Sequence, residues 1–89
     1  VPRYSIVKEK LVCPSDKLAA ITKMLRREYA SYNIDSRDGT KVILPNGWFL
    51  VRGSNTEPVI RVVAEAKSES EASEIVSKVR GEVERCIQA

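Results

Sequence analysis

The hydrophobic pattern of the chain has two periods, and the shorter of the two predicts strands. Four segments are rich in β-branched and aromatic side chains and alternate between two faces: 4–12, 40–44, 48–52 and 59–66. In the last segment Ile60, Val62, Ala64 and Ala66 share one face. Charged residues blur the alternation in the first segment, which indicates a strand at a sheet edge.

Two other segments repeat their apolar residues every three or four positions, as amphipathic helices do. The first begins at Ser15 and Asp16, and its apolar face is Leu18, Ile21, Leu25 and Tyr29. The second follows Ser68 and Glu71, which fit a capping box, and continues to residue 87. Tight turns between strands indicate antiparallel pairing. The predicted class is therefore α+β, an antiparallel sheet of about four strands with two helices on one face.

Length and composition indicate one ordinary globular domain over residues 1–89. The net charge of +3 is compatible with an anionic ligand but too slight to indicate nucleic acid. Cys13 and Cys86 have no zinc-ligand spacing, and two free thiols or one disulfide both stay open. No membrane span or signal peptide is recognisable, so we expect a cytoplasmic protein without a membrane partner. The start at Val1 rather than Met suggests a piece of a longer protein.

A polar loop between the last two predicted strands carries the candidate chemistry. It consists of Arg52, Gly53, Ser54, Asn55, Thr56, Glu57 and Pro58. Guanidinium, hydroxyl and amide donors on a short turn, with Arg61 nearby, are what a phosphate needs. Gly53 would let backbone N–H groups approach the ligand, and Glu57 would hold an arginine in place. The same residues are also ordinary turn formers, so a plain hairpin loop stays open as the alternative.

This loop, with Arg61 and Glu65-Ala66 after it, resembles the C-terminal domain of the α-D-phosphohexomutases. That family includes phosphoglucomutase, phosphomannomutase/phosphoglucomutase and phosphoglucosamine mutase. Asp38-Gly39 and Gly47-Trp48 also match its pattern, so the resemblance covers essentially the whole chain. The family's last domain has a fold similar to the TATA-binding protein, which agrees with the element order above.

The resemblance implies that the loop binds the phosphate of a phosphosugar that is not being transferred. The implied phosphate-binding residues are Arg52, Ser54, Asn55 and Thr56, with Arg61 as a supporting charge and Gly53 and Glu57 as loop support. Many members have another residue in place of Gly53. Phosphoglucosamine mutases commonly have glycine in place of Asn55, so Asn55 favours the phosphomannomutase/phosphoglucomutase branch.

The resemblance also implies what this chain lacks. The family transfers a phosphoryl group from a phosphoserine, with Mg²⁺ on an Asp-x-Asp-x-Asp loop, and no Asp-x-Asp occurs here. We therefore expect no catalytic residue, metal site or cofactor in this chain, with Mg²⁺ in the parent enzyme. The expected partners are a hexose phosphate and the other domains of the parent.

Two other classes of function stay open as alternatives. One is a small nucleic-acid-binding α+β module, which would need exposed aromatics or a Gly-x-x-Gly loop. The chain has one Trp, three Tyr and one Phe, and Gly53 has no glycine three residues later. The other is a structural interaction module in which the loop is an ordinary turn. It predicts that Arg52→Ala changes neither ligand binding nor activity of the parent enzyme.

Overall fold

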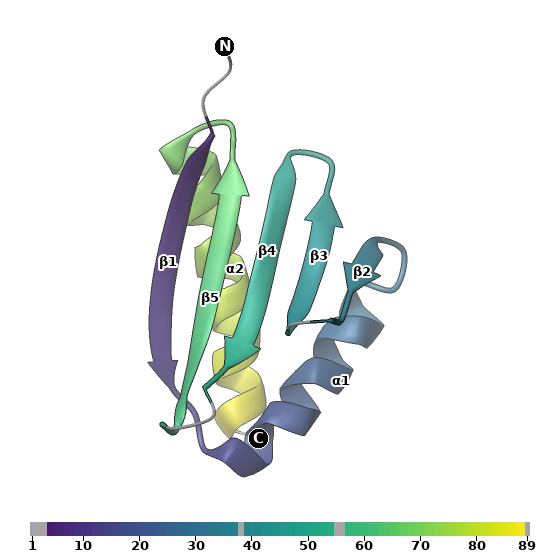
Figure 1. Ribbon diagram of the computed structural model, residues 1–89, viewed down its shortest axis with the longest axis vertical. Helices are drawn as coiled ribbons and strands as arrows, with labels where there is room; N and C mark the ends of the chain where they lie inside the picture. Colours follow the sequence, from purple (N-terminus) through teal and green to yellow (C-terminus); the bar gives the residue numbers. More distant parts are fainter. Residues whose placement is uncertain (1–3, 38, 55–56, 89) are drawn as a thin grey trace.

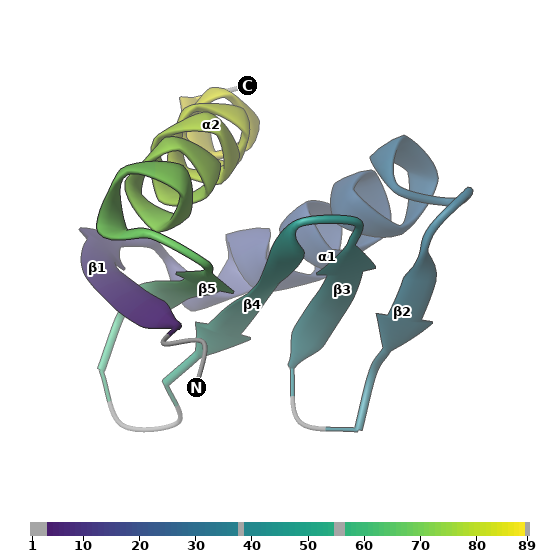
Figure 2. The same cartoon turned by 90° about the horizontal axis from the view of Figure 1, so that it is seen from above.

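One antiparallel sheet carries both helices on the same face (Figure 1, Figure 2). A computed structural model describes residues 4–37, 39–54 and 57–88. The elements are β1 (Ser5–Val12), a 3-10 turn (Ser15–Lys17), α1 (Leu18–Glu28), β2 (Asn33–Asp35), β3 (Thr40–Leu44), β4 (Gly47–Gly53), β5 (Val59–Ala66) and α2 (Glu69–Gln88). The predicted α+β class and the single layer of two helices are confirmed.

The sheet has the strand order β1-β5-β4-β3-β2, so β1 is an edge strand as its charge pattern predicted. The described residues contain five strands rather than about four, because β2 was not recognised from sequence. This strand has three residues and pairs only with β3. Only Ile34 of β2 packs against the core, and one apolar position is too few to show an alternation.

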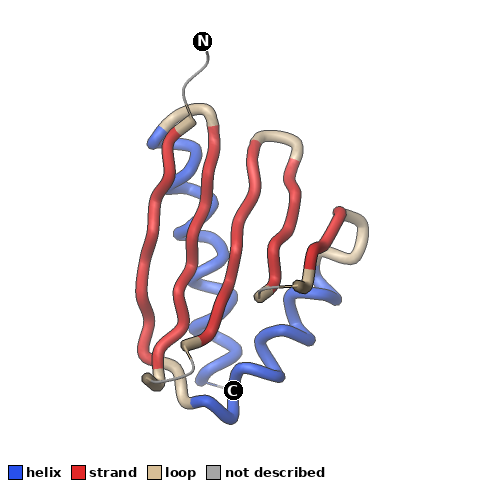
Figure 3. The backbone as a smooth tube through the Cα atoms, viewed as in Figure 1, coloured by secondary structure: helices blue, strands red, loops and turns tan. Residues whose placement is uncertain are grey.

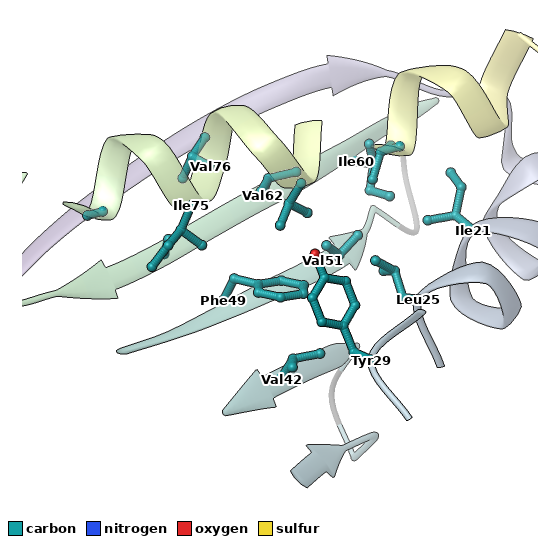
Figure 4. Close-up of a cluster of buried hydrophobic side chains, with 14 of the residues drawn as sticks. Ile21, Leu25, Tyr29, Val42, Phe49, Val51, Ile60, Val62, Ile75 and Val76 are labelled. Atoms are coloured by element: carbon teal, nitrogen blue, oxygen red, sulfur yellow. The ribbon is translucent and has the colours of Figure 1, made fainter. Parts of the chain in front are cut away.

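The core lies between the helices and the face of the sheet that they cover (Figure 4). Phe49 and Val51 from β4 and Ile60 and Val62 from β5 are buried there, each pair from one face of its alternating strand. The helices contribute their own apolar faces, including Ile21, Leu25, Val76, Val79 and Val83. The opposite face of the sheet is not covered by any described helix and carries the alternate residues of each strand (Figure 2).

The two helices begin in different ways. The α1 helix begins at Leu18, three residues later than predicted, and the backbone N–H of Lys17 donates to the carbonyl of Pro14 at 3.0 Å. This short-range bond forms a tight turn before the α-helix. The capping box of α2 is confirmed, because the backbone N–H of Glu71 donates to Ser68 Oγ at 3.2 Å. The Ser68 hydroxyl in turn donates to Glu71 Oε2 at 3.2 Å.

Tyr29 connects α1, α2 and the sheet at one point. Its hydroxyl donates to Glu82 Oε1 of α2 at 2.7 Å, while its ring meets the edge of Phe49 at a centroid distance of 5.0 Å. Burial, followed by the hydrogen bond to Glu82, raises the pKa of Tyr29 well above its ordinary value. The folded state therefore holds this phenolic proton more tightly than the unfolded chain does.

We expect the fold to become less stable in strong alkali, because the phenolic proton of Tyr29 is then removed. The unfolded phenol titrates near its ordinary pKa of about 10. The contribution of Tyr29 is thus fully present below that pH and is lost as the pH rises toward the higher folded value. Urea denaturation of the chain and of Tyr29→Phe, at about pH 9 and about pH 11, measures the difference. The variant should lose less stability between the two pH values, and an equal loss would contradict this assignment.

Candidate functional site

Two arginines lie side by side on the uncovered face of the sheet. Arg52 of β4 is the direct cross-strand partner of Arg61 in β5, and both side chains are exposed. Their neighbours Val51 and Val62 are also paired and are buried on the other face. Because directly opposite residues project from the same face of an antiparallel pair, both guanidinium groups lie over the same part of the sheet.

The two arginines line a small cavity at the end of β4. Its volume is about 240 Å³, and it is lined by Arg52, Gly53, Ser54 and Arg61. Three of these four residues belong to the loop identified from sequence, and the sheet register brings Arg61 to them. Asn55 and Thr56, also predicted to bind phosphate, lie outside the described residues, as does Asp38. The described lining therefore combines two fixed positive charges with a hydroxyl group.

Backbone hydrogen bonds attach the described parts of the loop to the strands on both sides. The backbone N–H of Ser54 donates to the carbonyl of Val59 at 3.1 Å. The backbone N–H of Cys13, just after β1, donates to the carbonyl of Pro58 at 2.8 Å. The described residues on both sides of the loop thus lie at the end of the sheet where β1 ends (Figure 3). Glu57 donates its backbone N–H to Ser54 Oγ at 3.3 Å. The predicted role of its carboxylate, holding an arginine in place, stays a prediction.

Gly53 has a packing role that sequence reasoning missed. A Cβ atom at this position would lie 2.6 Å from Leu18 Cδ2, at the start of α1. Glycine therefore lets α1 pack closely against the end of β4, beneath the cavity. Leu18, the first residue on the apolar face of the predicted helix, was the only signal in the sequence for this contact. The Leu18 atom nearest to Gly53 is the end of a flexible side chain, so a small residue in place of Gly53 can be accommodated when the Leu18 side chain moves.

Farther along the uncovered face, Trp48 makes two polar contacts. Its indole N–H donates to Glu65 Oε2 at 2.7 Å, and Lys41 Nζ lies 4.5 Å from the centre of its ring. Trp48 and Glu65 are direct cross-strand partners. The carboxylate of Glu65 is thereby held at the indole, and Glu65 lies four residues beyond Arg61 in β5. The ring face that would be needed to stack a base carries a lysine instead.

The donor set of the cavity does not fit a metal ion. Mg²⁺ takes oxygen ligands, and the charged groups here are guanidinium ions that repel a cation. No group of three His, Cys, Asp or Glu side chains in residues 4–37, 39–54 and 57–88 could hold a metal. Within the same residues, no helix combines the length and the apolar character needed to cross a membrane.

A larger cavity of about 610 Å³ lies in the helical layer, between α1 and α2. Its charged lining mixes Lys23, Arg27 and Arg85 with Glu28 and Glu82. Because positive and negative groups alternate there, the lining has no preference for one class of ion. The smaller cavity at Arg52 and Arg61 carries only positive charge among its described ionisable groups, so it is the candidate site for an anion.

Comparisons with a family model and with individual proteins indicate the same family. Residues 5–82 match the sequence model of the family described as phosphoglucomutase/phosphomannomutase, C-terminal domain. The chain is 45% identical over 83% of its length to the phosphoglucomutase/phosphomannomutase of Thermococcus kodakarensis, of which it covers 16%. It is 38% identical over 94% of its length to the phosphoglucosamine/phosphogalactosamine mutase of Sulfurisphaera tokodaii, of which it covers 19%.

A solved structure has the same fold. The chain matches a phosphoglucomutase/phosphomannomutase family protein from Burkholderia thailandensis with a TM-score of 0.68 and 24% identity. The match covers 96% of this chain and 18% of that protein. The chain thus spans about a fifth of the length of the relatives that it matches. By its sequence over residues 5–82, this chain belongs to the phosphoglucomutase/phosphomannomutase C-terminal domain family.

Proposed function

We propose that the chain is the phosphate-binding domain of a longer phosphohexomutase. The 52–58 loop and Arg61 would hold the phosphate group of a hexose phosphate, with Arg52, Ser54, Asn55 and Thr56 as binding residues. The observation that carries this proposal is the direct pairing of Arg52 with Arg61 at the mouth of the cavity. Like charges directly opposite each other destabilise a sheet, and a doubly charged anion between them removes that repulsion.

The strength of such a site comes from hydrogen bonds to a charged partner. Each contributes about 1.5–3 kcal/mol, roughly twice as much as a bond between neutral groups. Arginine can donate two parallel N–H bonds to phosphate, which fixes orientation as well as position. The loop's backbone bonds to β1 and β5 support it, because a donor that is already positioned loses little entropy when the ligand binds.

In the parent protein this domain would position the substrate while other domains supply the chemistry. The proposed reaction interconverts hexose 1-phosphate and hexose 6-phosphate, and this chain would hold the phosphate that is not transferred. Phosphoserine and Mg²⁺, as the resemblance implies, would belong to the other domains. Fixing one end of a sugar lowers the entropic cost of the transfer step, which is catalysis by positioning. We assign no catalytic residue to this chain and propose a cytoplasmic location.

The proposal also concerns which hexose phosphate the parent protein uses. The relatives include enzymes named for glucose and mannose phosphates and others named for glucosamine phosphate. We retain the branch that Asn55 favours, phosphoglucomutase/phosphomannomutase. A comparison of glucose 6-phosphate with glucosamine 6-phosphate on the complete enzyme tests it, and a preference for the amino sugar would contradict it.

A chemical-shift titration of the backbone amides tests the phosphate site directly. Glucose 6-phosphate is the ligand and unphosphorylated glucose is the control, both taken to tens of millimolar at constant ionic strength. We expect shifts of Arg52, Gly53, Ser54 and Arg61 with the phosphate ester only. Binding weaker than 1 mM, about −4 kcal/mol, is still measurable in this way. Equal shifts with glucose, or shifts confined to the cavity between α1 and α2, would sink the proposal.

A further inference from the structure

We propose that Lys10 of the edge strand β1 is a further phosphate-binding residue of this site. The inference rests on the proposed function, because it extends the same anion site by one strand. In the sequence, Lys10 is one of the charged residues that blur the alternation of the segment 4–12. Only the sheet register shows what this lysine faces.

The register puts three cations in one row across three strands. Lys10 of β1 is the direct partner of Arg61 in β5, and Arg61 is the direct partner of Arg52 in β4. All three side chains are exposed, and all belong to positions that alternate with core residues. Neighbouring partners are separated by about 4.5–5.5 Å between Cα atoms. The flexible four-carbon stem of Lys10 can therefore bring its ammonium group over Arg61.

A second hollow links Lys10 to the two arginines. It has a volume of about 340 Å³, and it is lined by Lys8, Glu9, Lys10, Leu50, Arg52, Arg61 and Val63. Arg52 and Arg61 also line the cavity at the loop. The two hollows are thus continuous from Gly53 and Ser54, across the arginine pair, to Lys10 at the edge of the sheet. An anion held by Arg61 can therefore be contacted by Lys10 from one side and by Arg52 from the other.

The carboxylates of Glu9 and Glu65 are engaged by groups other than Lys10 and Arg61. Glu9 also lines the hollow, and Arg80 Nη1 donates to its Oε1 at 2.7 Å. Glu65 accepts the indole N–H of Trp48 at 2.7 Å. Among the residues that the structure describes, no carboxylate lies within ion-pair distance of Lys10 or Arg61. Two adjacent like charges without such a partner attract an anion and gain stability when it binds.

Lys8 offers a matched control within the same strand. It projects from the same face and lines the same hollow, but its cross-strand partner is Val63 rather than Arg61. It lies two residues away, a displacement of about 6.6 Å along the strand. Substitution of either lysine by glutamine removes one unit of charge. Only Lys10→Gln removes it from the row that contains both arginines.

The experiment measures the dissociation constants of inorganic phosphate and glucose 6-phosphate for three chains. These are the unmodified chain, Lys10→Gln and Lys8→Gln, each titrated by amide shifts at an ionic strength of about 0.15 M, where the Debye length is about 8 Å. We expect Lys10→Gln to weaken binding about tenfold, as the loss of one charge-assisted contact does. Lys8→Gln should weaken it less than about twofold, because Lys8 is paired with Val63 and its replacement removes no direct contact with an anion at Arg61.

The possible results separate this inference from the proposed function. A selective loss in Lys10→Gln supports Lys10 as a binding residue. Equal losses in the two variants would mean that β1 contributes only a general positive field, and no loss in either would mean that it contributes nothing; both overturn the inference and leave the loop site intact. If the unmodified chain bound neither ligand, the proposed function and the inference would fail together. Unchanged amide spectra of the free variants verify that both fold.

Discussion

Replacing Arg61 by glutamine is expected to weaken glucose 6-phosphate binding about tenfold or more, which corresponds to about 1.4 kcal/mol or more. The same change should leave the free energy of unfolding unchanged or raise it by a few tenths of a kcal/mol. The two effects have opposite signs because Arg61 stands between Lys10 and Arg52 in the sheet. Its charge opposes the free fold and favours the complex. Amide-shift titration and urea denaturation of the same sample measure both quantities.

Arg26→Gln is the matched control for this substitution. Arg26 is exposed on α1, in the helical layer on the other side of the sheet, and its replacement changes the net charge equally. It should leave phosphate binding within about twofold, because charges beyond a Debye length are screened. An equal loss in the two variants would reduce the arginine pair to a general electrostatic effect. Destabilisation of more than about 1 kcal/mol by Arg61→Gln would instead give Arg61 a structural role.

Replacing Phe49 by alanine is expected to cost about 3–5 kcal/mol of stability. Phe49 is fully buried at the centre of β4 and meets the ring of Tyr29 edge-on (Figure 4). Truncation removes this contact and leaves a cavity beneath both helices that the rigid sheet cannot close. Because the free energy of unfolding of small domains is only about 5–15 kcal/mol, the folded state of the variant should be only marginally stable. Urea denaturation followed by circular dichroism measures the loss.

The neighbouring residue Leu50 provides the comparison. Leu50 belongs to the same strand but to the uncovered face, where it is half-buried. Leu50→Ala should cost about 1 kcal/mol, since the lost contacts are partly replaced by water. Similar losses for the two variants would contradict the assignment of one core face and one open face to β4. They would also imply that the uncovered face of the sheet is packed in solution.

The alternation of β5 was sufficient to predict which of its side chains share the core face. In β5, Ile60, Val62, Ala64 and Ala66 all face the helices, as a period of two requires. The apolar stripe of α1 likewise predicted the burial of Ile21 and Leu25. These predictions held because the hydrophobic effect acts on every residue of a long segment, and the polarity of each side chain indicates whether its burial is favourable. The three-residue strand β2 gave too few positions for such a pattern.

The candidate site could be predicted only in part. Its loop residues are contiguous, and their donor chemistry is visible in the sequence without a fold. The Arg52–Arg61 pairing, the place of Lys10 in the same row and the packing of Leu18 beneath Gly53 depend on which strands are neighbours and in what register. A slip of one residue would move each of these strand side chains to the other face.

The sequence by itself therefore determined the two helices, the four longer strands and the donor groups that the loop carries. The tertiary structure decided that β5 lies between β1 and β4, which brings Lys10 from one end of the chain to two arginines more than forty residues away. The physical reason is the range of the forces involved. Burial and turn preferences are local, so they are visible in the type of residue at each position. The partner of a charge is set by strand order, which the pattern of any one segment does not contain.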